Sequence, residues 1–304
     1  MHHLQIVPFL HHGYLAVEFF FILSGLLLCK SYCEKKQSIK TYFVGRIKKL
    51  YPQYFFALIV ITLYLIFRQI YHGTGETVCS IVTSFWGEVF LLHGIVPNWE
   101  ANNYPTWYVS VLLWGGTFIF MMLKKLSSKW IFILSPIFII GYYVYNFSVS
   151  NSIEIWTGVN PLLRGISDML IGVLLYLLLI EKDMISRIRI YSVWMKLIGL
   201  AGMAWCFCST QFYDMYAIFF LLVLIVGSIC SARDTLHLNK VSKYCYSMYL
   251  THALVIDYVR RLLKIYVEND ILVIIGVLLS ILFYSILFYV VTNWLTRKLL
   301  GANQ

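Results

Sequence analysis

Residues 271–296, ILVIIGVLLSILFYSILFYVVTNWLT, decide the class of protein, because they form one apolar run without a charged side chain. A helix needs about 20 mostly apolar residues to cross the hydrocarbon core of a bilayer. The whole chain agrees with this run: 60% of its 304 residues are hydrophobic and 12% are charged. A water-soluble domain of this composition would have too little polar surface. The sequence therefore predicts an all-α integral membrane protein.

Comparable runs recur along the rest of the chain and predict about nine transmembrane helices. They lie near 14–33, 52–71, 106–124, 129–147, 163–180, 193–210, 213–231, 243–262 and 271–296. A tenth stretch, 79–96, is interrupted by Glu88 and His93, and it can be interpreted as a span or as an interfacial or re-entrant helix. Without repeats or a Pro/Gly linker, we expect residues 1–304 to form one bundle domain.

The basic residues indicate the orientation. If 79–96 does not cross, the connections 34–51, 125–128, 181–192 and 232–242 and the C-terminal tail lie on one side. These connections and the helix ends beside them hold every Lys and Arg except Arg68, Arg164, Arg260, Arg261 and Lys264. By the positive-inside rule this side is cytoplasmic, which favours nine spans in the cell membrane and a cytoplasmic C-terminus. The net charge of +10 then reflects topology, and no nucleic-acid partner is expected.

The N-terminal segment, Met1 to Gly13, is predicted to lie outside and enters the membrane without a preceding helix, so we expect a missing first helix. It carries the pairs His2-His3 and His11-His12 without a carboxylate or cysteine beside them. That composition argues against a metal site, whereas a neutral imidazole could act as a general base. The seven cysteines show no CxxC pair and are interpreted as small apolar side chains; no permanently bound cofactor is expected.

Ionisable groups inside spans are costly and are functional candidates by default. Glu18 lies just inside the first span, and Asp168, with Arg164 near it, lies in the span near 163–180. Two turns beyond Glu18, Ser24 and Gly25 are equally consistent with close helix packing. His252 and Asp257, in the span near 243–262, are the remaining candidates.

Three further motifs lie near the membrane surface. Arg46-Ile-Lys-Lys49-Leu-Tyr51-Pro52 is predicted to begin a helix, either as a lipid-headgroup anchor or as a clamp for the phosphates of a cytoplasmic donor. Pro105-Thr-Trp107-Tyr-Val-Ser110 opens a span from the outer face, where Trp and Tyr are ordinary belt residues. The helix from Tyr244 to His252 carries polar side chains into the membrane, with Met248 and His252 on one face.

These motifs, in this order, resemble those of the acyltransferase-3 family over essentially the whole chain. The matching segments are Gly13 to Gly25, Arg46 to Pro52, Trp107 to Ser110, Arg164 to Gly172 and Tyr246 to His252. The family has ten core spans, so the resemblance implies that one is missing at the start. This sequence departs from the family pattern at two positions: Lys49 stands where the family has an Arg, and Leu112 stands where many members have an acidic residue.

The resemblance implies O-acyl transfer from a cytoplasmic acyl-CoA, typically acetyl-CoA, to a hydroxyl of an extracytoplasmic or membrane-linked glycan. His3 or His2 would act as the base, with Glu18 in the same catalytic group. Arg46, Lys49 and Tyr51 would bind the donor. The residues expected to line the substrate path are Trp107, Ser110, Arg164, Tyr246, Ser247 and His252. Membrane lipid and the acceptor are the expected partners.

Two alternatives stay open at this point. A transporter or flippase of lipid-linked sugars would use the same buried polar groups to line a path, although no inverted repeats are visible. An inactive, truncated remnant would explain the missing first helix. The sequence does not identify the acceptor, the acyl group or the oligomeric state.

Overall fold

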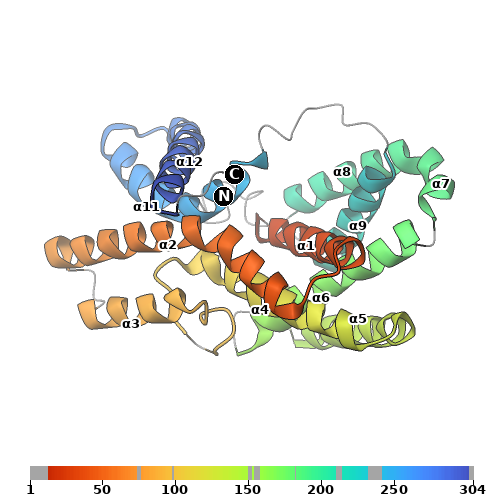
Figure 1. The fold of residues 1–304 in the computed structure, drawn as a ribbon. Coiled ribbons are helices and arrows are strands. Elements are labelled where there is room, and N and C mark those ends of the chain that lie inside the picture. Colours follow the sequence, from red (N-terminus) through yellow and green to blue (C-terminus); the bar gives the residue numbers. More distant parts are fainter. Residues whose placement is uncertain are drawn as a thin grey trace. The chain divides into compact units, whose positions relative to one another are not determined.

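The computed structural model describes residues 13–73, 77–97, 99–149, 153, 158–181, 183–209, 214–231 and 242–300. Every regular element in these ranges is a helix (Figure 1). The helices are α1 (Leu15–Glu34), α2 (Ile39–His72), α3 (Val78–Val89), η3 (Tyr104–Thr106), α4 (Trp107–Lys125), α5 (Ser128–Val149), α6 (Asn160–Tyr176), η4 (Leu177–Glu181), α7 (Ile185–Ile188), η5 (Arg189–Tyr191), α8 (Ser192–Cys208), α9 (Asp214–Cys230), α11 (Cys245–Tyr266) and α12 (Asp270–Leu300). The predicted all-α class is confirmed for this part of the chain.

Seven helical segments of the described chain are long and apolar enough to cross a membrane. They are 15–34, 39–72, 104–125, 128–149, 160–180, 185–208 and 270–298. Each overlaps one of the predicted spans. Two more predicted spans correspond to α9, which is apolar but has 17 residues, and to α11, so the count of nine stays a prediction.

The uncertain stretch 79–96 forms the short helix α3 and then leaves helical geometry after Val89. Twelve residues rise only about 18 Å, whereas the hydrocarbon core is about 30 Å thick. This length supports an interfacial or re-entrant helix. The side chain of Thr77 caps its first turn by accepting from the Ser80 amide at 3.1 Å.

One prediction about α2 is wrong. Pro52 was expected to begin a helix, but α2 begins at Ile39 and contains Pro52 in its interior. The polar stretch 39–51 continues the helix beyond the apolar run because helix geometry does not end where hydropathy falls. Arg46, Lys49 and Tyr51 are therefore helical residues rather than residues of a loop before a helix.

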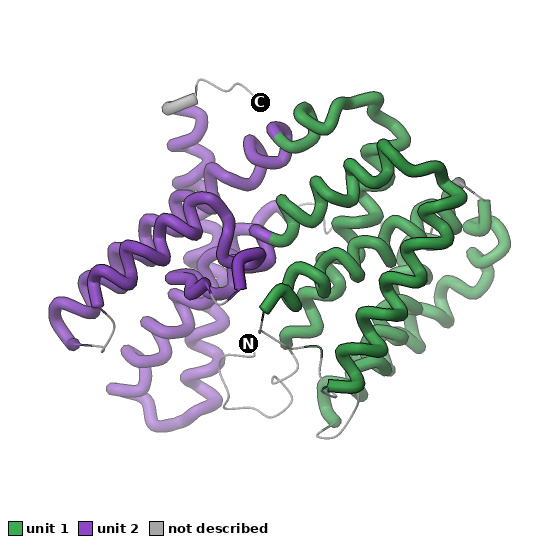
Figure 2. Tube along the Cα trace, turned by 90° about the horizontal axis from the view of Figure 1, so that it is seen from below, with its two compact units in different colours: residues 1–43, 111–233 green, residues 44–110, 234–304 purple. Residues whose placement is uncertain are grey.

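The chain divides into two compact units, shown in different colours in Figure 2. Unit 1 comprises residues 1–43 and 111–233, and unit 2 comprises residues 44–110 and 234–304. The expectation of one membrane domain over residues 1–304 stays a prediction.

In unit 1, α1 packs against α6 through backbone-to-backbone contact (Figure 1). A Cβ at Gly25 would collide with the Met169 carbonyl, and one at Gly172 would collide with the backbone of Ile22 and Leu26. Small residues permit such close approach between membrane helices, as expected for Gly25. In the same unit α8 packs against α9, where a Cβ at Gly202 would meet the ring of Phe220.

In unit 2, α11 packs against α12 (Figure 1). Hydrogen bonds join α2 to both α3 and α11, as described below. The stripe of α11 formed by Ser247, Leu250, Thr251 and Val255 is buried, which matches the three- and four-residue spacing of one helix face.

Candidate functional site

The predicted site residues separate by unit. Glu18 and Arg164 belong to unit 1. Unit 2 holds Arg46, Lys49, Tyr51, Trp107, Ser110, Tyr246, Ser247 and His252. His2 and His3, the expected bases, lie outside the described residues, as do His11 and His12.

In unit 1, Glu18 of α1 and Arg164 of α6 form an ion pair away from solvent. Arg164 Nε donates to Glu18 Oε1 at 2.8 Å, and its Nη2 contacts the same oxygen. Both side chains are fully buried, at 2% and 0% exposure. One helical turn along α6, Asp168 accepts a hydrogen bond from Tyr143 of α5. The Arg164 guanidinium is thus paired with the Glu18 carboxylate. A catalytic role for Glu18 and a substrate-binding role for Arg164 stay predictions.

Helix α11 begins against the middle of α2. Tyr246 donates its hydroxyl to the Leu50 carbonyl at 3.1 Å, and the Ser247 hydroxyl donates to Gln53 Oε1 at 3.0 Å. Arg46 lies one turn before Leu50 and Lys49 lies one turn before Gln53, and the two cations, three residues apart, share a face of α2. Arg46 is half-buried and Lys49 is exposed, and each lies within one turn of a residue of α2 that α11 contacts.

Tyr51 does not join this pair. It lies on a different face of α2, and its hydroxyl donates to the Val89 carbonyl at the end of α3 at 2.8 Å. Tyr54, one turn further, donates to the Glu88 carbonyl at 2.7 Å. These two tyrosines fasten the end of α3 to α2, so the predicted donor-binding role of Tyr51 has no support from its contacts.

The segment between α3 and α4 is organised by the buried carboxylate of Glu88. Its two oxygens accept from the backbone amides of Asn102 and Asn103 at 2.9 and 3.0 Å. The Asn103 side chain in turn donates to the Leu250 carbonyl of α11 at 3.0 Å. Glu88 therefore folds the segment back on α3, and Asn103 joins it to α11.

His93 occupies the interior of the same segment, with 7% of its surface exposed. The Thr106 hydroxyl donates to the Asn103 carbonyl at 2.7 Å, so it accepts from His93 Nε2 at 3.0 Å. Nε2 then carries the proton and Nδ1 is the bare nitrogen. Among the described residues, buried Nδ1 has no hydrogen-bond partner.

The start of α4 is also buried. Ser110 donates to the Leu91 carbonyl and accepts from the Gly94 amide at 3.3 Å. Trp107 is 5% exposed, so the expectation of an ordinary interfacial belt residue is wrong for this side chain. Tyr249 of α11 donates to the Pro105 carbonyl just before it. Tertiary packing buries the Trp107 side chain.

His252 lies on the same helix as Tyr249, and its Nδ1 is 2.6 Å from the Tyr249 carbonyl. A carbonyl only accepts, so Nδ1 is the donor in this contact. His252 and Ser247 are on α11, whereas Trp107 and Ser110 are on α4, and Asn103 connects the two helices. Sequence reasoning missed Glu88, His93 and Asn103 as site residues; an acid and a histidine interrupting an apolar stretch were the available signal.

Burial shifts both titratable groups of this segment toward their neutral forms. It raises the pKa of Glu88 to about 7, although the two backbone amides oppose the shift. It lowers the pKa of His93 to about 4. At neutral pH His93 is therefore an uncharged imidazole.

These two shifts predict opposite pH dependences of stability. Between pH 4.5 and 6.5, folded Glu88 holds a proton that the unfolded chain releases, so acidification stabilises the fold; folded His93 lacks a proton that the unfolded chain binds, so acidification destabilises it. From pH 6.5 to 4.5, Glu88→Gln should lose about 2 kcal/mol of stability relative to the wild type, and His93→Gln should gain about as much. Thermal midpoints in detergent across this range test both signs. Parallel curves for the three proteins would contradict the assignment.

Comparison with known proteins gives one match, to a family model. Neither a curated protein nor a solved structure matches the chain. A family model described as an acyltransferase domain matches residues 3–290, which cover most of each unit and all five segments from Gly13 to His252 that carry the resemblance. That match covers nearly the whole sequence, and the chain belongs to the acyltransferase-3 family.

Proposed function

We propose that this protein transfers an acyl group, typically acetyl, from cytoplasmic acyl-CoA to a hydroxyl of an extracytoplasmic or membrane-linked glycan. The carbonyl carbon of the thioester is attacked by the acceptor oxygen, the carbon–sulfur bond breaks, and CoA leaves as the thiol. The acceptor hydroxyl gives its proton to a base, for which His3 or His2 is proposed, and the CoA sulfur takes up a proton.

The observation that carries this proposal is that unit 2 contains both a cationic and a polar group of motif residues. Arg46 and Lys49 stand beside the contacts of Tyr246 and Ser247 with α2. On α4, Ser110 and Trp107 lie next to the Glu88 segment, which Asn103 joins to α11. Cationic side chains suit the phosphates of a CoA donor, and the outer motif residues suit an acceptor approaching from the opposite side of the membrane.

The proposed location is the cell membrane, with the C-terminus in the cytoplasm. The distribution of Lys and Arg supports this orientation. It would place Arg46 and Lys49 on the donor side and Trp107 and Ser110 on the acceptor side. Glu18 and Arg164 would then shape unit 1 rather than contact CoA.

The test uses the full chain in proteoliposomes with acyl-labelled acetyl-CoA and a preparation of envelope glycan. Acyl transfer predicts CoA thiol release that depends on the glycan, together with label in the glycan that mild alkali removes as an ester. A flippase would move lipid-linked sugar without releasing CoA. Movement without release would overturn the proposal, and absence of both activities would favour the inactive remnant.

The donor-binding pair predicts a specific kinetic change. Arg46→Gln should raise the KM for acetyl-CoA about tenfold or more with little change in kcat, because a charge-assisted hydrogen bond to phosphate contributes about 1.5–3 kcal/mol. Arg46→Lys should recover part of the loss, since it keeps the charge and loses the planar fork. Lys48→Gln, an exposed neighbour on another face of α2, is the matched control. A kcat effect with unchanged KM would contradict donor binding.

A further inference from the structure

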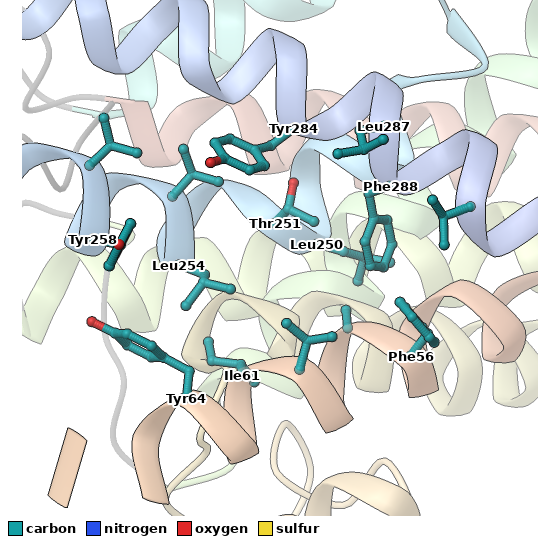
Figure 3. A pocket seen from close by; sticks show the side chains of 15 residues that line it. Phe56, Ile61, Tyr64, Leu250, Thr251, Leu254, Tyr258, Tyr284, Leu287 and Phe288 are labelled. Carbon is teal, nitrogen blue, oxygen red and sulfur yellow. The ribbon is translucent and has the colours of Figure 1, made fainter. Parts of the chain in front are cut away.

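Unit 2 contains an elongated apolar pocket of about 440 Å³ that the proposed reaction does not use. Side chains of α2, α11 and α12 line it, and Figure 3 shows them converging from the three helices. Among the described lining residues, the polar side-chain groups are the hydroxyls of Tyr64, Thr251, Tyr258 and Tyr284 (Figure 3). Such a lining suits a hydrocarbon chain rather than a sugar or a nucleotide.

Aromatic pairs bound the two ends of the pocket. The rings of Phe56 and Phe288 lie 5.6 Å apart at one end, and those of Tyr64 and Tyr258 lie 6.3 Å apart at the other (Figure 3). From Phe56 to Tyr64 the helix rises about 12 Å. The pocket therefore runs along α2, and its tyrosine end is the more polar one.

A cationic cluster begins one turn beyond the tyrosine end. Asp257 Oδ2 accepts from Tyr64 and from Arg68 Nη1, each at 3.0 Å, and Asp257 Oδ1 accepts from Arg261 Nε at 2.9 Å. The Asp257 carboxylate thus pairs with both Arg68 and Arg261, and the three side chains together carry one net positive charge. Arg261 is 65% exposed, so its guanidinium is accessible to a ligand as well as to Asp257.

The basic residues of this cluster lie at helix ends on the predicted outer side, where the positive-inside rule expects few Lys and Arg. Arg68, Arg260, Arg261 and Lys264 are four of the five basic residues that depart from the positive-inside distribution. The fifth, Arg164, is buried against Glu18. Lys264 pairs with Asp270 at 3.6 Å, and Asp257, Glu268 and Asp270 together offset three of the four positive charges, which leaves one in excess. Topogenesis does not account for a net positive cluster at this end, whereas an anionic headgroup does.

We infer that this pocket binds one acyl chain of an anionic glycerophospholipid, with the lipid phosphate at Arg68 and Arg261. An apolar channel that ends in aromatic rings followed by arginines matches the order of chain, interface and phosphate in such a lipid. The cluster is net positive, so an anionic headgroup is favoured over a zwitterionic one. The inference does not depend on acyl transfer, because lipid binding is measured without a donor or an acceptor.

The experiment is photocrosslinking of the full chain in phosphatidylcholine nanodiscs that contain a trace of phosphatidylglycerol with a photoactivatable acyl chain. Mass spectrometry should locate the adduct on the lining segments of α2, α11 and α12. Unlabelled phosphatidylglycerol should compete at least tenfold better than added phosphatidylcholine. Adducts spread evenly over exposed helix faces, or equal competition by the two lipids, would overturn the inference.

Variants separate the chain site from the headgroup site. Leu254→Trp should fill the pocket and reduce labelling at least fivefold, whereas Leu279→Trp, on an exposed face of α12, should not. Arg68→Gln with Arg261→Gln should abolish the preference for phosphatidylglycerol, and the corresponding double Lys variant should retain most of it. The double Gln variant also removes both arginine partners of Asp257, which could change the stability of the fold. The double Lys variant keeps the positive charges, and an unchanged thermal midpoint in it shows that its lipid preference is measured on a folded protein.

Two outcomes bear on the identity of the lipid. If a polyprenyl phosphate displaces the label at lower concentration than phosphatidylglycerol, the glycerophospholipid assignment is overturned in favour of a lipid-linked substrate. If labelling persists unchanged in Leu254→Trp, the pocket is not the site of the chain. Arg187→Gln, an exposed arginine of α7 in unit 1, should leave labelling unchanged in either case.

Discussion

Arg164→Met is expected to destabilise unit 1 by about 3–5 kcal/mol, because it leaves Glu18 as a buried carboxylate without its partner. Asp168, one turn along α6, adds a second carboxylate to the same interior. Neither group reaches water, so the cost of the unpaired charge is not relieved by solvation. The loss should appear as a lower thermal midpoint in detergent and as faster proteolysis of α1 and α6.

The double variant Glu18→Gln with Arg164→Met is the control for this prediction. It removes both members of the pair and should recover most of the stability that Arg164→Met loses. Activity then separates two roles for Glu18. A stable, active double variant indicates a structural pair, whereas a stable but inactive one supports the predicted catalytic role. A double variant no more stable than Arg164→Met would contradict the ion-pair account.

Replacing the proposed base should have the largest effect on catalysis. Either His3→Asn or His2→Asn should lower kcat by about 10²–10⁴-fold, because a positioned general base contributes about that factor. The KM for acetyl-CoA should change little, since the base acts on the acceptor hydroxyl. Glycan-dependent release of CoA measures both parameters.

The other histidines of the chain provide matched comparisons. His11→Asn and His12→Asn change the same N-terminal segment and should retain activity. His93→Gln should change stability and its pH dependence rather than kcat, because His93 Nδ1 is buried away from a substrate hydroxyl. A large kcat loss in His93→Gln with a normal thermal midpoint would instead identify His93 as the base.

Most helices of this protein could be predicted from the sequence, because a run of about 20 apolar residues is stable in the hydrocarbon core only as a helix. The runs near 14–33 and 129–147 coincide closely with α1 and α5. The start of α2 was not accessible, because residues 39–51 extend the helix outside the apolar run and hydropathy has no signal for them. The structure of 79–96 depended on where helical hydrogen bonding stops, and at that point Tyr51 and Tyr54 of another helix donate to the last carbonyls of α3.

Sequence by itself determined the membrane class, the positions of most described helices and the family resemblance, because these follow from composition and local order along the chain. Only the tertiary structure decided which polar groups meet. It paired Glu18 with Arg164, gathered Arg68 and Arg261 around Asp257, and buried Trp107 and His93. These pairings join residues far apart in the chain, and a buried charge or hydrogen-bonding group is stable only where packing brings a complementary group to it.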